Sequence, residues 1–429
     1  MTMSPRDFLL DLYARVVAAA HPASCLPEHL PPPPEAGRLI ILAAGKAAGS
    51  MTEIAEAHYL DHGLPATRLA GIAVTRHGYA RPTRVLSVIE AGHPVPDAAG
   101  LQAAETALQL AGSAAADDLV LVLLSGGASA NWVAPAEGVA FAEKQAVTRA
   151  LLRSGASIDE INTVRKHLSR IKGGRLAVQA SPACVVSLAI SDVPGDDPAV
   201  IGSGPSVPDP STLADAQAVV EKYRLTLPDA IDRALQAEAN ESPKPDHPAF
   251  RNSAFRLIAR PADAFAVARA QVTAAGYECE FLGDRVEGEA RAVAKEHAAL
   301  AREIQAQGRR AVILSGGELT VTIHGQGRGG PNQEYALALA QALDGAEGIA
   351  ALAADTDGTD GGAGSADDPA GALVDGTSAA RARAIGLDAA QFLAQNDSTT
   401  FFERLGDLVN PGPTFTNVND FRALVIDPR

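Results

Sequence analysis

Two basic residues of this sequence, Lys46 and Arg328, lie beside glycines at points where a helix is expected to begin. Lys46 follows Gly45 at the end of an apolar segment, and Arg328 lies in the glycine-rich run 325–330 before Pro331. Free N–H groups at a helix N-terminus carry partial positive charge, so both places favour an anion such as phosphate. Taken alone, Lys46 could equally be a solvent-facing loop lysine, and the spacing of a Walker A loop is absent.

Short glycine segments offer a second kind of anion site. Successive N–H groups without obstructing Cβ atoms can wrap phosphate oxygens, although a plain tight turn explains such glycines about as often. Two Ser-Gly-Gly turns and the long loop 191–205 have this character, and loops of that length are more often functional than not. Glu318 follows the second turn and suits a hydroxyl group or a metal-bound water. The residues concerned are Ser125, Gly126, Gly127 and Ser129, then Gly202, Ser203 and Gly204, then Ser315, Gly316 and Gly317.

The segment 162–174 carries the most concentrated positive charge of a chain whose formal net charge is −15. At helical pitch Arg165, Ser169 and Lys172 share one face, which would give a carboxylate or phosphate two cations and a hydroxyl. A solvated basic helix face is the alternative interpretation. We predict an anion-binding face.

Carboxylates that follow two apolar segments could hold a hydrated Mg²⁺ ion. Asp192 comes after the segment 184–190, and Asp357 and Asp360 follow the segment 349–353. Such carboxylates on flexible backbone suit magnesium beside phosphates. Aspartates also form turns without any metal, and this alternative stays open.

The apolar segments that precede these residues predict the strands of an α/β fold. They are short, rich in β-branched residues and separated by Ala-rich amphipathic segments such as 101–111 and 141–152, which we interpret as crossover helices. Ligands of parallel sheets bind beyond the carboxyl ends of the strands, where the candidate residues lie. The predicted strands are 39–43, 72–74, 85–89, 119–124 and 184–190, followed by 255–259, 311–314, 319–323, 349–353 and 423–426.

Length and composition set the number of domains. A chain of 429 residues predicts two of them, and the proline-rich segment 240–250 places the boundary between residues 245 and 246. The apolar fraction is 47% but aromatic residues make up only 4%, so Ala, Val, Leu and Ile must fill the cores. This favours strands covered by helices on both faces.

Charge and cysteine content argue against several classes of partner. A net charge of −15 disfavours nucleic acid and anionic membranes. The cysteines Cys25, Cys184 and Cys279 lie too far apart for a disulfide framework or a zinc site. The N-terminal segment has charged residues where a signal peptide is apolar, and no apolar stretch approaches the ~20 residues that span a bilayer. We therefore expect a cytoplasmic protein with neither nucleic acid nor membrane as partner.

The order of these motifs resembles that of the class II glycerate kinases, whose C-terminal part is called the MOFRL domain. The resemblance covers roughly residues 5–427. Ten motifs carry it in sequence: GK, AGHPVPD, SGG, NTVRKHLSRIKGG, SDVPGDDP with IGSGP, SGGE, GRGGPNQE, DTDGTDGG, NDS and TNVND.

The resemblance implies a fold and an activity. The expected fold is a Rossmann-like, doubly wound, mainly parallel sheet in residues 1–245 and a smaller mixed-sheet α/β domain in residues 246–429, with the active site in the cleft between them. The expected reaction is phosphorylation of D-glycerate at its 2-hydroxyl by ATP with Mg²⁺. Lys46 and Arg328 become the catalytic cations, while the Ser-Gly-Gly turns, Asp192 and the DTDGTDGG loop line the nucleotide and metal side.

The remaining residues receive hypothetical roles. We expect the Arg165 and Lys172 face, together with Glu318 and Asn332, to bind the acceptor. His93, in AGHPVPD, is a candidate general base, although a histidine before proline is more often a structural cap. A monomer and a homodimer both stay open.

Two alternative functions stay open as well. Hydroxypyruvate reductase would need a nicotinamide site, and we expect no strand of this chain to lead into a G-x-G-x-x-G loop with an acidic residue about 20 positions on. A non-catalytic protein that binds nucleotide or phosphosugar is the other alternative.

Overall fold

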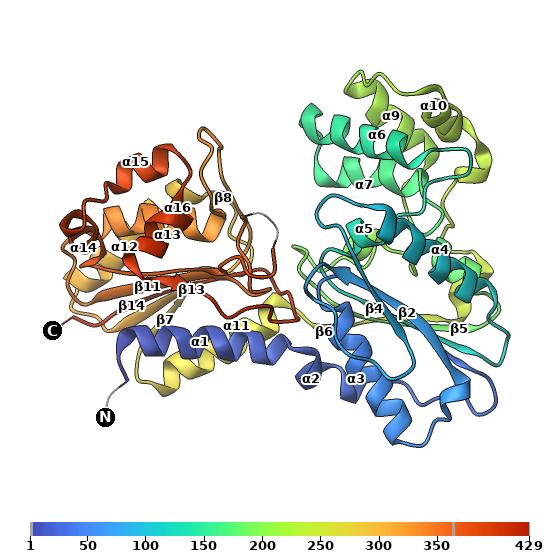
Figure 1. Ribbon diagram of the computed structural model, residues 1–429, viewed down its shortest axis with the longest axis horizontal. Coiled ribbons are helices and arrows are strands. Elements are labelled where there is room, and N and C mark those ends of the chain that lie inside the picture. Colours follow the sequence, from blue (N-terminus) through green and yellow to red (C-terminus); the bar gives the residue numbers. More distant parts are fainter. Residues whose placement is uncertain (1–2, 363–364, 429) are drawn as a thin grey trace. The chain divides into compact units, whose positions relative to one another are not determined.

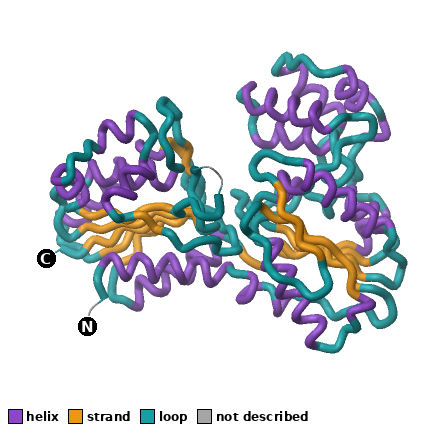
Figure 2. The backbone as a smooth tube through the Cα atoms, viewed as in Figure 1, coloured by secondary structure: helices purple, strands orange, loops and turns teal. Residues whose placement is uncertain are grey.

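We describe a computed structural model of the chain, in which residues 3–362 and 365–428 are placed. The chain forms two compact units. Unit 1 comprises Met1–Ser24 and Ala259–Arg429, and unit 2 comprises Cys25–Ile258. Each unit contains a six-stranded sheet with helices packed on it, as the ribbon and the secondary-structure colouring show (Figures 1 and 2).

The sheet of unit 2 has the strand order β3-β2-β1-β4-β5-β6, the order of a doubly wound sheet. Pairing is parallel between β1 and β2, β1 and β4, β2 and β3, and β4 and β5. β1 and β4 contain only Leu, Ile, Val and Ala and are buried along their whole length, as expected of central strands. The strands are β1 (Leu39–Ala44), β2 (Leu69–Arg76), β3 (Ser87–Ala91), β4 (Leu119–Leu124), β5 (Cys184–Ile190) and β6 (Ser253–Ala259).

The helices of unit 2 form two groups. Near the sheet lie α3 (Ala48–Asp61), α4 (Ala98–Gly112), α5 (Ala128–Asn131) and α8 (Arg175–Ala180). A second group with its own apolar core projects beside the sheet (Figure 1). It consists of α6 (Phe141–Ser154), α7 (Ile158–His167), α9 (Leu213–Lys222) and α10 (Asp229–Gln236). Short 3₁₀ helices occur at η1 (Pro27–His29), η2 (Ala66–Arg68), η3 (Ile201–Ser203), η4 (Glu238–Asn240) and η5 (Pro248–Asn252).

The sheet of unit 1 is mixed, with the order β13-β12-β11-β14-β9-β7. Only β7 and β9 pair in parallel, and the other four pairings are antiparallel. Its strands are β7 (Glu278–Phe281), β9 (Ala311–Ser315), β11 (Ile349–Asp355), β12 (Gly371–Asp375), β13 (Leu408–Val409) and β14 (Asp420–Ile426), and β8 (Gly288–Glu289) pairs separately with β10 (Leu319–Thr320). The predicted combination of a parallel and a mixed sheet is confirmed.

Helices cover both faces of the unit 1 sheet (Figure 1). α1 (Pro5–Ala20) and α11 (Pro261–Ala274) lie on one face, and α12 (Ala290–Ala306) and α13 (Pro331–Ala342) on the other. The shorter helices are α2 (Pro22–Cys25), α14 (Ser378–Ala384), α15 (Ala389–Ala394) and α16 (Ser398–Leu405). None of the helices in residues 3–362 and 365–428 combines the length and the hydropathy that a membrane-crossing segment requires.

The N-terminal helix α1 belongs with the C-terminal half of the chain, which differs from the predicted boundary at residues 245 and 246. Its buried face packs on α11, β11 and β14. The Phe8 ring stacks on Tyr277 at 5.5 Å between centroids, and the Tyr13 hydroxyl donates to the Asp355 carbonyl at 2.8 Å. These contacts join residues more than 250 positions apart, so a local composition signal could not reveal them.

Two strand predictions also differ from the structure. The segment 255–259, predicted to open the second sheet, is part of β6 at the edge of the unit 2 sheet beside β5. The predicted strand 319–323 is a strand only at Leu319 and Thr320. Four strands were not predicted: β7, which carries two glutamates, β8 and β13, which are two residues long, and β12.

Candidate functional site

The turn after β1 is hydrogen-bonded to the first Ser-Gly-Gly turn, which follows β4. The N–H of Lys46 donates to the Gly126 carbonyl at 2.7 Å, and the N–H of Ala47 donates to Ser125 Oγ at 2.9 Å. Gly45 has a φ of 118°, and a Cβ there would lie 2.4 Å from the Ser125 carbonyl oxygen. Strand order reverses between β1 and β4, the place where doubly wound sheets bind ligands.

Gly127 brings the side chains of His93 and Lys46 to the same turn. A Cβ at Gly127, whose φ is 85°, would lie 2.9 Å from His93 Cδ2, 3.0 Å from His93 Nε2 and 3.4 Å from Lys46 Cγ. The ring edge that carries Nε2 therefore faces the turn. Residues from the loops after β1, β3 and β4 thus gather at the carboxyl ends of three strands.

The loop 191–205 contacts this turn through serine hydroxyls. Ser129 Oγ and Ser203 Oγ lie 2.7 Å apart, within hydrogen-bond distance. Gly202, Ser203 and Gly204 all have positive φ, between 58° and 63°. Asp192, the first acidic residue of the loop, is half-buried at the end of β5. The structure therefore brings the predicted glycine and serine residues of unit 2 together.

Arg165 and Lys172 meet at one backbone carbonyl, but not as one helical face. Lys172 Nζ donates to the Ser129 carbonyl at 2.8 Å, and Arg165 Nη2 donates to the same oxygen at 3.3 Å. The prediction that Arg165, Ser169 and Lys172 share a helix face is wrong, because α7 ends at His167. Ser169 Oγ accepts the N–H of Lys172 at 3.3 Å and so shapes the turn that follows.

Lys144 is a third basic residue of this region and was not among the predicted site residues. It lies on α6, is 5% exposed, and donates from Nζ to the Leu168 carbonyl at 2.6 Å. Burial lowers the pKa of Lys144 well below its ordinary value, and the nearby positive charge of Arg165 lowers it further. Burial acts in the same direction on the pKa of Lys172. The available signal was the position of Lys144 on the apolar face of α6, three residues before Val147.

Arg328 lies in a pocket of unit 1 of about 500 Å³. Its Nη2 donates to Glu403 Oε2 at 3.1 Å, and its backbone N–H donates to Asp397 Oδ1 at 3.0 Å. Its side chain is 61% exposed and available to an anion in place of Glu403. The pocket is lined by Arg328, Gly362, Asp367, Asp368, Pro369, Thr399, Phe402, Glu403, Gly406, Leu408 and Asn410.

Asp360 and Asn332 form a buried network rather than an open ligand site. Asp360 Oδ1 accepts the backbone N–H of Asn332 at 3.0 Å, and Oδ2 accepts the backbone N–H of Gln333 at 2.8 Å. Asn332 Nδ2 also donates to Asp420 Oδ1 at 2.7 Å. Burial raises the pKa of Asp360 to about 7 against the opposing effect of these N–H donors. Both residues thus fix the N-terminus of α13, and their predicted metal and acceptor roles gain no support from this placement.

The structure offers limited ligands for Mg²⁺. Among residues 3–362 and 365–428, no three or more His, Cys, Asp or Glu side chains are grouped as a metal site. Asp357 Oδ1 accepts the N–H of Thr359 at 2.8 Å and caps its own turn. Mg²⁺ often binds proteins through one or two carboxylates, with phosphates and water completing its shell. Asp192 or Asp357 fits that minimal role.

The second Ser-Gly-Gly turn is packed against its own unit. The N–H of Gly316 donates to the Gly283 carbonyl at 2.8 Å, and Arg422 Nε donates to Ser315 Oγ at 3.2 Å. A Cβ at Gly317 would lie 2.3 Å from the backbone nitrogen of Val286. Glu318 is exposed. Close packing therefore accounts for these glycines, and nucleotide binding at this turn stays a prediction.

The glycines of the Arg328 segment do fall at G-x-G-x-x-G spacing, at Gly325, Gly327 and Gly330. No strand leads directly into them, because β10 ends at Thr320. A Cβ at Gly325 would lie 2.2 Å from the Gln395 carbonyl oxygen, and one at Gly327 would lie 2.3 Å from Asp397 Cβ. Their role in the structure is close packing on residues 395–397.

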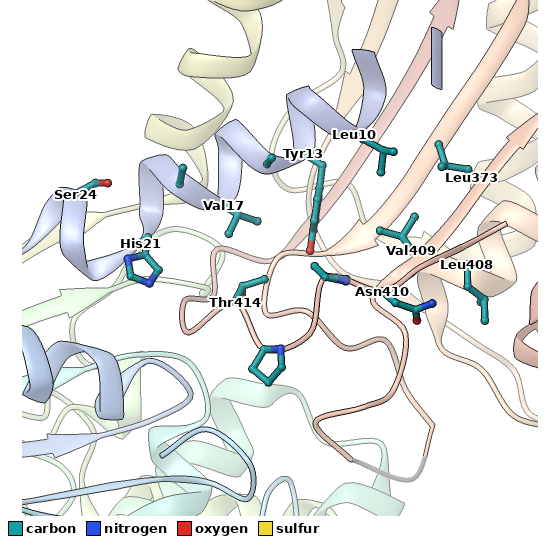
Figure 3. A pocket seen from close by; sticks show the side chains of 14 residues that line it. Leu10, Tyr13, Val17, His21, Ser24, Leu373, Leu408, Val409, Asn410 and Thr414 are labelled. Atoms are coloured by element: carbon teal, nitrogen blue, oxygen red, sulfur yellow. The ribbon is translucent and has the colours of Figure 1, made fainter. Parts of the chain in front are cut away.

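A further pocket of unit 1, of about 730 Å³, lies between α1 and the segment 408–414 (Figure 3). Its walls are mainly apolar, with Leu10, Val17 and Leu408 among them. The Tyr13 hydroxyl within it already donates to a backbone carbonyl. The pocket has no predicted site residue and we assign it no part in the chemistry.

Family models match most of the chain. Residues 8–236 match the "Domain of unknown function (DUF4147)", and residues 311–420 match the "MOFRL family". The first match lies mostly in unit 2 and the second lies in unit 1.

Relatives cover nearly the full length. A protein of Agrobacterium vitis with the provisional name hydroxypyruvate reductase is 45% identical over 99% of this chain and 95% of its own. A D-glycerate 2-kinase of Thermotoga maritima is 39% identical over 97% of both chains. The crystal structure of a glycerate kinase from Thermotoga maritima matches with a TM-score of 0.84 and 38% identity over 98% of both chains. The chain belongs to the class II glycerate kinase family, with its MOFRL domain in unit 1.

Proposed function

We propose that the chain transfers the γ-phosphoryl group of ATP to the 2-hydroxyl of D-glycerate, forming 2-phosphoglycerate and ADP. The observation that carries the proposal is the junction of the turns after β1 and β4, where Lys46, His93 and Gly127 meet. The choice of D-glycerate as the substrate rests on similarity to the D-glycerate 2-kinase of Thermotoga maritima.

The step needs a positioned acceptor and a neutralised phosphoryl group. The 2-oxygen of glycerate bonds to the γ-phosphorus as the bond to the bridging oxygen of ADP breaks. Lys46 supplies positive charge beside the glycine turn of unit 2. Positioning and charge stabilisation together account for most of the catalysis in phosphoryl transfer.

His93 is the proposed acceptor of the proton from the 2-hydroxyl. Its Nε2 edge faces the Gly127 turn, next to the Lys46 stem. A histidine has an ordinary pKa near neutrality and suits this task. Mg²⁺, when bound with ATP, neutralises phosphate charge, and either Asp192 or Asp357 is its proposed protein ligand.

Phosphorylation is tested by a coupled assay of ADP release with ATP, Mg²⁺ and D-glycerate. Phosphorus NMR of the product then distinguishes 2- from 3-phosphoglycerate. We expect glycerate-dependent ADP release and a 2-phosphate signal. ADP release that does not depend on glycerate would contradict the proposal.

Hydroxypyruvate reductase is the second candidate, because the Agrobacterium vitis relative carries that provisional name. It requires a bound nicotinamide, and the one glycine run with suitable spacing is not preceded by a strand. Incubation with hydroxypyruvate and NADH, followed at 340 nm, separates the two activities. We expect no change in absorbance.

A further inference from the structure

Unit 2 contains a pocket of about 320 Å³ beside the junction of turns just described. This volume lies at the lower end of the roughly 300–1,000 Å³ that is usual for small-molecule sites. The pocket shares Ser129 with the glycine turn, and its wall residue Pro94 follows His93 directly. It is lined by Pro94, Val95, Pro96, Ser129, Val133, Phe141, Lys144, Gln145, Thr148, Arg149, Leu152, Ile158, Ile161, Arg165 and Lys172.

Three basic side chains of this pocket have no acidic partner. Within the described part of the chain, no carboxylate oxygen lies within 4.0 Å of a side-chain nitrogen of Lys144, Arg165 or Lys172. Lys144 and Lys172 are only 5% and 1% exposed. Among the described residues, each lysine donates one hydrogen bond, to a backbone carbonyl, although an ammonium has three donors. Buried charge without a counter-ion is costly, so an anionic ligand is the natural complement.

The mouth of the pocket is apolar and exposed. Val95, Leu152 and Ile158 are 64%, 63% and 58% exposed, although large apolar side chains are usually buried. Gln145 Nε2 donates to the Pro96 carbonyl at 2.9 Å, which ties α6 to the loop after β3 and holds the two walls together. A ligand for this pocket therefore has an anionic end and an apolar body.

We propose that this pocket is the acceptor pocket and that it takes 2-hydroxycarboxylates with an apolar substituent at C3, their carboxylate on Lys172 and Arg165. The assignment rests on the proposed function. Glycerate itself has only a hydroxyl at C3 and leaves the apolar walls unused. The reaction is the same for the larger acids: the 2-oxygen bonds to the γ-phosphorus, ADP leaves, and the hydroxyl proton passes to the base.

Binding of the carboxylate is linked to proton uptake. Burial lowers the pKa of Lys144 and Lys172, and the cations that face them are Arg165 on α7 and, for Lys144, Arg170 and Arg175. Arg149 is a further cation of the lining. A bound carboxylate favours the charged amines and raises their pKa again. Affinity should therefore fall as pH rises, and protons should be taken up on binding.

The first experiment is titration calorimetry of the full chain with 3-phenylpropionate, which has the carboxylate and ring but no hydroxyl to phosphorylate. Benzylamine, with a ring and the opposite charge, is the matched control. We expect the acid to bind with proton uptake, seen as heats that depend on the ionisation enthalpy of the buffer, and the amine not to bind. Equal binding of both would overturn the proposal.

Two variants test whether 3-phenylpropionate binds in this pocket. Thr148→Trp should fill it, and Thr273→Trp is the control, since both hydroxyls donate to the carbonyl four residues earlier, at 3.0 Å and 3.1 Å. Leu152→Asp adds a negative charge at the exposed mouth, with Ile385→Asp as its control. We expect at least tenfold weaker 3-phenylpropionate binding in Thr148→Trp and Leu152→Asp, and parent affinity in the controls.

Measurements of kinase activity on two acceptors distinguish the pocket assignment from the proposed function. We expect D-3-phenyllactate to accept phosphate, and its kcat/KM relative to D-glycerate to fall at least tenfold in Thr148→Trp. Normal glycerate kinase activity with no binding of 3-phenylpropionate would overturn the pocket assignment alone. Binding of 3-phenylpropionate without kinase activity on any hydroxy acid would overturn the proposed function, and the acceptor role with it.

Discussion

The backbone of Lys46 is fixed by a hydrogen bond that does not involve its side chain, so the side chain can be substituted without loss of that bond. Its N–H bonds to the Gly126 carbonyl in any substitution except proline. Lys46→Ala should therefore fold normally and lower kcat with ATP and D-glycerate by about 10²–10⁴-fold, through loss of preorganised positive charge. Steady-state kinetics, with circular dichroism as the folding control, test this. Near-normal turnover in a folded variant removes Lys46 from the mechanism.

Gly127 is the second residue with a direct test. Gly127→Ala puts a Cβ 2.9 Å from the His93 ring and should displace it, lowering kcat/KM by about 10²-fold. Gly138→Ala is the matched control: its φ is 77°, close to the 85° of Gly127, but its Cβ would meet nothing within 4 Å. Equal losses in the two variants would show that backbone strain alone is responsible.

The structure brings the candidate residues of unit 2 together, whereas several candidate glycines of unit 1 lie in closely packed turns. Lys46, His93 and the first glycine turn follow separate strands of a parallel sheet, and parallel topology brings such positions together. In unit 1 the glycines at 316, 317, 325 and 327 serve close packing, which has the same sequence signature as anion binding. Lys144 was not predicted because its environment depends on the tertiary fold. Only the fold buries it, with its amine bonded to the Leu168 carbonyl and the positive charge of Arg165 nearby.

At the scale of elements, α12 and α13 are joined by a buried histidine. His297 Nδ1 lies 2.8 Å from the Tyr335 hydroxyl, and burial lowers the pKa of His297 to about 4, with Arg422 adding to the effect. The unfolded chain takes up a proton near the ordinary value of 6.5, so this stability is present above pH 6.5 and is lost as pH falls toward 4. The free energy of unfolding should fall by on the order of 3 kcal/mol over this pH range.

The measurement is urea unfolding at several pH values between 4 and 7. His297→Gln should flatten the acid side of the profile of unfolding free energy, while exposed His62→Gln should not. A profile unchanged by His297→Gln would assign the acid sensitivity to other groups.

Some central strands were predictable, but β12, which lies between β11 and β13 in its sheet, was not. β4 and β5 have the predicted bounds, since uninterrupted apolar runs leave little choice of register or burial. α7 stops at His167 although its charge pattern continues to Lys172. The Ser169 hydroxyl accepts the N–H of Lys172, and Ser169 pairs with Pro135 in an isolated bridge. A serine side chain that bonds to the backbone competes with the hydrogen bonds of a helix, and the spacing of charged residues does not indicate this competition.

At the scale of the molecule, unit 2 is one continuous segment and unit 1 is made of two. The fragment Cys25–Ile258 contains a complete sheet and its helices, and we expect it to unfold cooperatively in urea. The fragment Ala259–Arg429 lacks α1 and exposes the apolar surfaces of α11 and β11, so it should not. Fusing residues 1–24 to it through a flexible linker should restore a cooperative transition, measured by circular dichroism. Cooperative unfolding without the fusion would contradict this account.

Domain boundaries are the property that composition predicted least well. The prolines of 240–250 do mark irregular chain, but β6 follows them and returns to the unit 2 sheet, so the division falls after Ile258. A second division after Ser24 has no compositional signal. It follows from the apolar face of α1, whose partners lie in the other half of the sequence.

Unit 1 is built from two segments that are far apart in the sequence, and this affects how the chain folds during its synthesis on the ribosome. α1 is translated first, but β11 and β14, on which it packs, emerge last, with β14 ending at Ile426. At translation rates of about 5–20 residues per second, the helix waits roughly 20–80 seconds for them. Phe8, Leu9, Leu12 and Val16 stay without their complete native cover during that interval. Unit 2 can complete its fold meanwhile, so the nascent helix still presents apolar side chains to which a chaperone can bind.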